Sequence, residues 1–450
     1  MRFLLITLLL LSFPSLGWAN ERFLDIQELT TPSGIPVWLV EDHSVPIISL
    51  KFSFKGAGAV HETSEKQGLV QILSNTMDEG AGDLDSQTFQ KTLSDNSISL
   101  SFSGGRDNFS GNLKTLTENK ETAFDLLHLA LTEPRFDAEP LERMKQSNIS
   151  RIKNSMPQPS WINARIMNDI AFAGHPYAQN SGGTLSTIPN ITADDLRAFM
   201  KNELFKGRLV VSIAGDITKE DAITIVEETF SGLPQILYED MPLPLTLQGA
   251  NTTTLYEHDI PQTFIKMILP GVRRTDPDYY AAMVMNQIFG ASGFGSRLME
   301  RIREKEGLTY GIYSGLSEMI WTQTLQISTS TKNETTAKTI DLIKQEASKL
   351  RQTPITESEL QHAKDYILGS LPLSLTSTDA LASIMLSLQV NDLPSTYLDT
   401  IDQKVNSVTI EDVQRVSQRL LDMDKATTIL VGKPTDITPT KTIQTLPNVK

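Results

Sequence analysis

The strongest constraint in this 450-residue sequence is an internal repeat. An alternating strand pattern runs from Val45 to Gly56, and a stretch of the same length with the same closing glycine runs from Ile260 to Gly271. Further on, residues 191–196 match residues 408–413, where a threonine is followed three positions later by an aspartate, as at a helix N-terminus. Because the matching blocks keep their order at an offset of about 215 residues, we predict two homologous domains that arose by duplication.

Each repeat begins with strand patterns and continues with amphipathic helices. A helix is predicted after the first strands of each half, at residues 65–77 and 277–289, and an apolar strand ending in glycine comes late, at residues 209–215 and 427–432. This order predicts the α+β class, with two tandem homologous α/β sandwich domains. In each domain, helices are expected to pack on one face of a mixed, mainly antiparallel sheet.

The domain limits follow from a change in composition between the repeats. Residues 231–252 contain prolines and glycines and show little periodicity, which indicates a linker. The first domain is therefore predicted at residues 20–230 and the second at residues 253–450.

The first nineteen residues have the pattern of an export signal. Arg2 precedes an apolar run at residues 3–13, and Gly17 and Ala19 stand where a signal peptidase cleaves. The alternative, an uncleaved anchor helix, is disfavoured because the apolar run is much shorter than the roughly 20 residues that span a bilayer. We therefore expect a periplasmic or secreted protein with no membrane span after cleavage, for which a chain without cysteine is suited.

Composition also limits the chemistry and the partners. The absence of cysteine excludes disulfides, thiol catalysis and cysteine-bound zinc. A formal net charge of −14 repels polyanions, so nucleic acid is not expected as a partner.

The segment Gly68–Met77 has the frame Gly-Leu-x-x-x-Leu-x-x-x-Met on a predicted helix, and here the sequence resembles the pitrilysin-like (insulinase family) zinc metallopeptidases. In that family the same helix carries His-x-x-Glu-His, two zinc ligands and a general base. The resemblance places the two histidine positions on Gln71 and Asn75 and the base position on Ser74. The family's third ligand, a glutamate, falls on Arg151 by counting from the family's pattern.

These four replacements do not fit zinc chemistry. Amide side chains are poor zinc ligands, a serine has no basic pKa near neutrality, and a guanidinium repels a cation. No two histidines are spaced one turn apart, and a displaced metal site at Asp78 and Glu79 is disfavoured because adjacent carboxylates at a helix end are usually solvated. We predict no metal and no cofactor in this chain.

A second family motif is intact. A glycine-rich segment at residues 290–295 precedes a charged helix that is expected to end at Gly307, with a strand beginning near Leu308. The glycines indicate a turn, because the Gly-Lys-Ser/Thr of a phosphate loop is missing. The block Arg-Glu-Lys-x-Gly-Leu-x-Tyr resembles the family's second signature, which implies that Arg303 and Tyr310 bind substrate. Without the resemblance, the two would be a solvated helix charge and a half-buried strand aromatic.

The resemblance covers nearly all of the chain after the export signal and implies a division of labour. The family includes two-chain enzymes in which one subunit holds zinc and the other supplies the arginine and the tyrosine. We therefore expect a non-catalytic, substrate-binding subunit that forms a heterodimer with a zinc-bearing pitrilysin-like paralogue, with peptides or unfolded segments as substrate. The alternative is a peptide-binding or scaffold protein, possibly a homodimer, and a third reading is an independent peptidase with an altered metal site.

Overall fold

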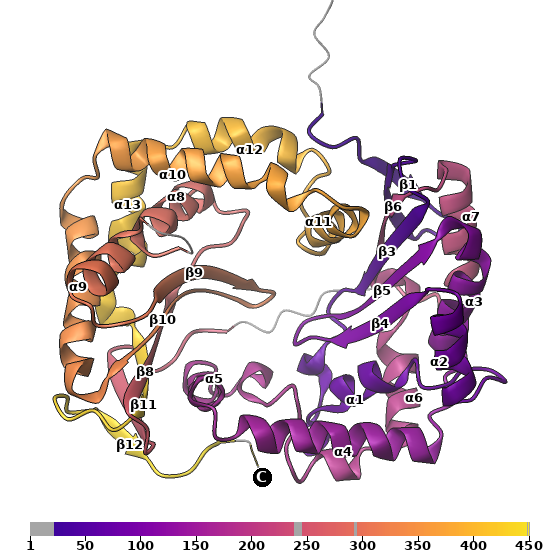
Figure 1. Ribbon diagram of the computed structural model, residues 1–450, viewed down its shortest axis with the longest axis horizontal. Helices are drawn as coiled ribbons and strands as arrows, with labels where there is room; N and C mark the ends of the chain where they lie inside the picture. Colours follow the sequence, from indigo (N-terminus) through magenta and orange to yellow (C-terminus); the bar gives the residue numbers. More distant parts are fainter. Residues whose placement is uncertain (1–21, 238–244, 292–294, 448, 450) are drawn as a thin grey trace, which may run out of the picture.

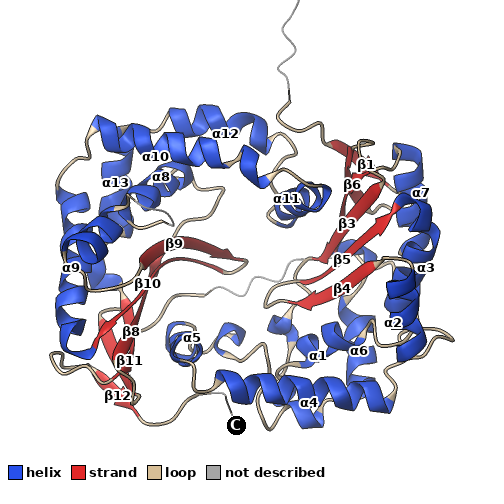
Figure 2. Cartoon of the chain, in the orientation of Figure 1, coloured by secondary structure: helices blue, strands red, loops and turns tan. Residues whose placement is uncertain are grey.

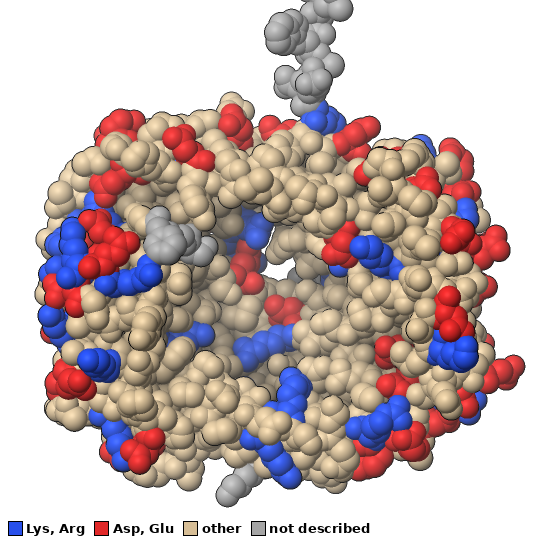
Figure 3. All heavy atoms as spheres, in the orientation of Figure 1, with Lys and Arg blue, Asp and Glu red and all other residues tan. Residues whose placement is uncertain are grey.

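The computed structural model describes residues 22–237, 245–291, 295–447 and 449. The predicted export signal lies outside these residues, as does part of the predicted linker. Figure 1 shows two halves, one from each repeat, arranged around a central opening, and Figure 3 shows the opening between their surfaces.

The first half contains a six-stranded sheet in the order β1-β2-β6-β3-β5-β4. Only β2 and β6 are parallel, and the other neighbours are antiparallel. The strands are β1 (Gln27–Thr30), β2 (Pro36–Glu41), β3 (Ile47–Phe54), β4 (Ser99–Gly104), β5 (Phe109–Leu116) and β6 (Leu209–Gly215).

The second half repeats this plan in the order β12-β7-β11-β8-β10-β9. Here β7 is parallel to β11 and to β12, and the other pairs are antiparallel. The strands are β7 (Thr252–Glu257), β8 (Gln262–Pro270), β9 (Ile312–Met319), β10 (Thr322–Lys332), β11 (Thr427–Gly432) and β12 (Lys441–Ile443). The prediction of two homologous α/β sandwiches with mixed, mainly antiparallel sheets is confirmed, whereas the limits 20–230 and 253–450 stay predictions.

The helices of each half lie mainly outside its sheet (Figure 2). Those of the first half are α1 (Leu69–Thr76), α2 (Ser86–Asp95), α3 (Lys120–Thr132), α4 (Ala138–Ser155), α5 (Pro159–Ala171), α6 (Ala193–Glu203) and α7 (Lys219–Thr229). Those of the second half are α8 (Tyr279–Phe289), a π-helix (Met299–Lys305), α9 (Thr336–Gln352), α10 (Glu357–Ser370), α11 (Thr378–Val390), α12 (Tyr397–Asn406) and α13 (Ile410–Leu420). Thr192 and Thr409 form the two predicted N-caps, each as a full capping box with an aspartate.

The halves also exchange one helix each, which the sequence did not predict. Helix α5 of the first half packs on β11 and β8 of the second sheet, while α11 of the second half packs on β6 and β3 of the first (Figure 1). Ile162 and Ile166 of α5 share an apolar cluster with Ile429, and Met385 of α11 shares one with Trp38. Part of the second face of each sheet is therefore covered by a helix of the opposite half.

A buried side-chain amide holds each exchanged helix on the sheet of the opposite half, at equivalent strands of the two sheets. Asn163 of α5 donates to the carbonyl oxygen of Ile429 at 3.0 Å. Gln389 of α11 donates to the carbonyl oxygen of Val211 at 2.8 Å and to the hydroxyl of Ser212 at 2.7 Å. Since β6 and β11 occupy equivalent positions in the two sheets, the anchors are counterparts of each other.

Among the described residues no single helix is long and apolar enough to cross a membrane. The stretches Glu357–Ser374 and Thr378–Val390 meet that criterion only when taken together, and they are bent by 119° relative to each other.

Candidate functional site

Helix α1, which carries three of the four replaced zinc-site positions, begins later than predicted. The expected helix over residues 65–77 starts at Leu69, because Gly68 adopts a left-handed conformation with φ 89°. The carboxylate of Glu62 accepts hydrogen bonds from the backbone N–H groups of Gly68 (2.9 Å) and Val70 (2.7 Å). Burial raises the pKa of Glu62 to about 8, although these two hydrogen bonds act in the opposite direction.

Gln71, Ser74 and Asn75 lie together on one side of α1 and bond to one another. The Gln71 amide nitrogen donates to the side-chain oxygen of Asn75 at 3.1 Å, and its distance to the Ser74 hydroxyl is 3.4 Å. Ser74 in turn donates to the carbonyl oxygen of Gln71 at 3.0 Å. The three side chains thus bond to one another and to their own helix in the place where a metal and a base would stand in an active member of the resembled family.

Arg151 lies on α4, which packs against α1. Its guanidinium donates to the side-chain oxygen of Asn148, and Asn148 donates to the carbonyl oxygen of Gly182 at 3.1 Å. Arg151 is exposed, so its charge is solvated and directed to the Gly182 loop. This arrangement makes it part of the support of that loop.

No group of three or more histidine, aspartate or glutamate side chains within the described ranges is arranged to hold a metal ion. Burial raises the pKa of Asp78 to about 6, and the neighbouring charge of Glu79 adds to the rise. Glu79 itself accepts hydrogen bonds from Arg143 and Ser86. Glu79 is therefore engaged in the packing of α2 and α4, and the prediction of a metal-free chain remains a prediction.

Tyr310 stands on a rigid loop in the second half and points into solvent. The predicted strand start near Leu308 is wrong, because β9 begins at Ile312. Threonines of β10 hold the loop instead: Thr331 donates to the carbonyl oxygen of Leu308 at 2.7 Å and Thr329 to that of Gly311 at 2.9 Å. The Tyr310 side chain is 89% exposed, so a fixed backbone presents a free phenol.

Arg303 lies one turn before that loop, on the π-helix Met299–Lys305. Such helices are rare and occur frequently at functional sites. The helix ends as predicted at Gly307, which has φ 63°. Salt bridges from Arg301 and Lys338 to Glu306, both 2.7 Å long, fix the end of this segment. The glycine-rich turn expected at residues 290–295 lies partly outside the described residues.

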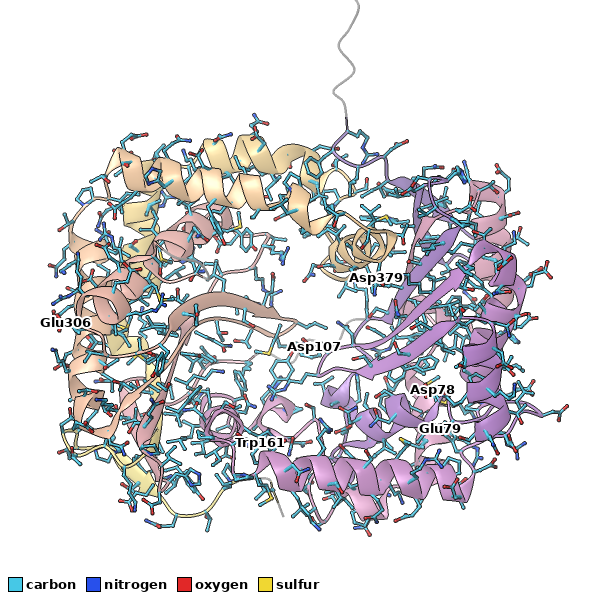
Figure 4. The ribbon with its side chains drawn as sticks, in the orientation of Figure 1. Asp78, Glu79, Asp107, Trp161, Glu306 and Asp379 are labelled. Atoms are coloured by element: carbon cyan, nitrogen blue, oxygen red, sulfur yellow. The ribbon has the colours of Figure 1, made fainter. Side chains whose placement is uncertain are left out.

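The structure separates the kept motif from the replaced one. Figure 4 places Glu306, which lies between Arg303 and Tyr310 in the chain, at the opposite side of the molecule from Asp78 and Glu79, which directly follow α1. The two motifs of one chain therefore do not meet.

The tips of two hairpins meet at the centre of the molecule. Asp107, in the β4–β5 turn, accepts hydrogen bonds from the hydroxyl of Tyr177 and from the backbone N–H of Ile320 in the β9–β10 turn (3.2 Å). The ring of Trp321 lies 5.7 Å from that of Tyr177. Burial and the charge of Asp107 raise the pKa of Tyr177, which therefore stays a neutral donor.

Comparison with known proteins agrees with this geometry. Residues 190–367 match the family model described as the peptidase M16 inactive domain. A solved structure of a peptidase M16 inactive domain from Pseudomonas fluorescens superposes with a TM-score of 0.86 at 26% identity, covering 92% of this chain and all of that one. The chain is therefore a homologue of the peptidase M16 proteins.

Two curated relatives of this M16 homologue extend over nearly the full length. The non-peptidase homologue YmxG of Helicobacter pylori is 26% identical, covering 92% of this chain and 94% of its own. The uncharacterized zinc protease YmxG of Bacillus subtilis is 25% identical, covering 90% and 98%. Its match to the M16 inactive domain and its four replaced positions mark the chain as an inactive M16 homologue.

Sequence reasoning missed two structural features near these positions. Glu62 gave no signal, because its role depends on the left-handed turn at Gly68. The segment His175-Pro176-Tyr177 has no strand or helix periodicity, yet Tyr177 is buried between the two halves. A tyrosine directly after a proline was the one available sign.

Proposed function

We propose that this chain is the non-catalytic, substrate-binding subunit of a heterodimeric zinc peptidase. It supplies Arg303 and Tyr310 to the active site of a zinc-bearing M16 paralogue that cleaves peptides or unfolded segments. The observation that carries the proposal is the exposure of Tyr310 on an anchored loop, remote from the chain's own degenerate metal positions.

The chemistry of the two side chains suits this role. A guanidinium offers fixed, charged donors to a carbonyl or carboxylate oxygen, and a phenol adds a neutral donor. Placed beside a zinc ion, the pair stabilises the negative charge that develops on the substrate oxygen during attack. The paralogue holds the zinc and the general base, so this chain needs no cofactor of its own.

The proposed location follows from residues 1–19. A cleaved export signal delivers the subunit to the periplasm or outside the cell, where its paralogue must also be exported. Mass determination of the protein purified from a bacterial periplasm tests this, because retention of residues 1–19 contradicts it.

The decisive experiment is co-expression with a zinc-bearing M16 paralogue encoded beside this gene. The complex is expected to cleave an unfolded peptide and to contain zinc in the paralogue alone. Arg303→Ala with Tyr310→Phe is expected to lower kcat/KM by about 10²–10³, the usual cost of removing a transition-state donor, while both subunits stay associated.

The matched control is Tyr366→Phe, which removes a half-exposed phenol from α10 and should leave kcat/KM unchanged. Unaltered activity of the Arg303 and Tyr310 double variant contradicts the proposal. So does a stable homodimer that binds peptide while no paralogue associates with it, an outcome that favours a peptide-binding scaffold.

A further inference from the structure

Three basic side chains from distant parts of the chain are close enough for their charges to interact. Arg106 lies in the β4–β5 turn, Arg165 on the exchanged helix α5, and Lys266 on β8. Lys266 alternates with the core residues Ile265 and Met267, so it points from the second sheet toward the side that α5 covers. In Figure 3 both basic and acidic atoms are visible around the central hollow.

The charges of these residues act on one another. Burial lowers the pKa of Lys266, and the positive charge of Arg106 lowers it further. Burial likewise lowers the pKa of Arg165 to about 10, again with a contribution from Arg106. Burial also lowers the pKa of Arg106 itself. Like charges that are partly removed from water and close enough to repel are unfavourable unless an anion offsets them.

The anions within the chain offset this cluster only in part: the charge of Asp107 raises the pKa of Arg106 and that of Asp169 raises the pKa of Arg165, but burial outweighs both. Among the described residues, no hydrogen bond or salt bridge engages the guanidinium of Arg106 or the ammonium of Lys266. Asp107 is next to Arg106, but its two oxygens accept from Tyr177 and from Ile320. Arg165 is only 3% exposed; its terminal nitrogens donate to the carbonyl oxygens of Ala178 and Gln179, and its Nε has no partner.

An open pocket of about 430 Å³ adjoins Arg106. It is lined by Ser103, Gly105, Arg106, Asp107, Asn108 and Ser110 from the first half and by Met319 from the second. Hydroxyl and amide groups from one side and a thioether from the other provide polar and apolar contacts for a peptide. The space lies next to β4, an edge strand.

We propose that Arg106 and Lys266, with Arg165 behind them, form a subsite for a peptide carboxylate inside the central opening. The ligand is either the C-terminal carboxylate of a peptide or an acidic side chain, since the two offer the same group to the cations. The subsite rests on the proposed function in one respect, that this chain binds peptides. It adds a preference for carboxylates, which Arg303 and Tyr310 do not supply.

The test is a binding measurement on the purified protein alone, without paralogue or zinc. Four fluorescent versions of one short extended peptide are compared: a free C-terminus without acidic residues, its carboxamide, the carboxamide with one internal glutamate, and the same with glutamine. Each carboxylate is expected to bind about tenfold more tightly than its neutral counterpart, as for a hydrogen bond to a charged group. A preference in only the first pair identifies the C-terminus as the ligand, and one in only the second pair identifies a side chain.

Lys266→Met and Arg106→Gln are each expected to reduce the preference to less than about twofold, with unchanged affinity for the carboxamide without glutamate. Lys114→Met is the matched control, because it removes the same charge from β5, where Lys114 makes no hydrogen bond or salt bridge within the described residues. If Arg106→Gln fails to fold, Lys266→Met still decides the question.

Three outcomes overturn the subsite: equal binding of all four peptides, no detectable binding of any, or an equal loss of preference in Lys114→Met. Failure of the proposed heterodimer is a separate result, since it appears as missing hydrolysis with a paralogue. Carboxylate preference in this chain would then belong to a peptide-binding protein that works without a peptidase.

Discussion

The two halves share one sheet order, yet the acidic side chains at the starts of α1 and α8 lie in different environments, one buried and the other near the surface. Helix α1 begins at the buried carboxylate of Glu62. Helix α8 begins beside Asp276 and Asp278, which form salt bridges with Arg415 and Arg419 near the surface. Both halves retain the same packed sheet and helices, whereas the polar groups at the helix starts differ. Conservation of the fold therefore does not require conservation of the site, and only the second half keeps a family motif.

Because α5 and α11 are exchanged, the stability of each half should depend on the other. Truncation of buried side chains in these two helices is expected to have the largest effect. Ile166→Ala in α5 and Met385→Ala in α11 each remove buried apolar contacts and should lower the free energy of unfolding by about 2–5 kcal/mol. Calorimetry should show a single transition that moves as a whole in both variants. A profile that splits into two transitions, only one of them shifted, contradicts this dependence. Leu373→Ala, at an exposed position, is the control and should change stability by less than about 0.5 kcal/mol.

The two helix starts should respond to pH in opposite directions. Folded Glu62, with a pKa of about 8, keeps a proton that the unfolded chain releases near the model value of 4.5. Its contribution to stability is therefore complete below about pH 4.5 and is lost as the pH rises through about 8. Relative to Glu62→Gln, wild-type stability should fall by on the order of 5 kcal/mol across this window, as measured by urea unfolding.

Asp276 provides the counterpart in the second half. The hydrogen bond from Arg419 lowers the pKa of Asp276, so its contribution is present above the unfolded value and is lost as the pH falls through the folded value. Asp276→Asn should therefore change the free energy of unfolding least at acidic pH, whereas Glu62→Gln should change it most at acidic pH. Equal pH slopes in both variants contradict the contrast between the two helix starts.

The two amide anchors should be of similar strength. Asn163→Ala and Gln389→Ala each leave a buried strand carbonyl without its side-chain donor, which should cost about 1–3 kcal/mol in chemical denaturation. Gln403→Ala on exposed α12 is the control, with an expected change below about 0.5 kcal/mol. If only one of the two variants is destabilised, only that amide contributes to holding its helix on the opposite sheet.

The smallest effect is expected at Arg151. Arg151→Ala should change the free energy of unfolding by less than about 0.5 kcal/mol, because the side chain is exposed and Asn148 keeps its bond to Gly182. Thermal unfolding with Asn148→Ala as the contrasting variant checks this, since Asn148 is buried and should cost about 1–3 kcal/mol. A large loss in Arg151→Ala would mean that the arginine has taken over a role in holding α4 to α1.

The sequence predicted what depends on local pattern. The strands at residues 209–215 and 427–432 and the capping boxes at Thr192 and Thr409 depend on periodicity and nearest neighbours, and all are present. The helix exchange was not predictable, because Asn163 meets Ile429 only after both sheets have formed. The conformation of Tyr310 was missed for a related reason. Its loop is held by the hydroxyls of two threonines of β10 and not by backbone hydrogen bonds between strands, and the sequence pattern does not show such side-chain contacts.

The meeting of the two hairpin tips has a topological consequence. Through Asp107, Ile320 and Trp321, the tips join the halves across the centre of the molecule and complete a closed circuit of protein around the opening. A polypeptide lying in that opening can leave lengthwise, or sideways only after the tips part. Release of a long unfolded segment then depends on how much chain must slide through, so that residence time increases with segment length even where the contacts are the same.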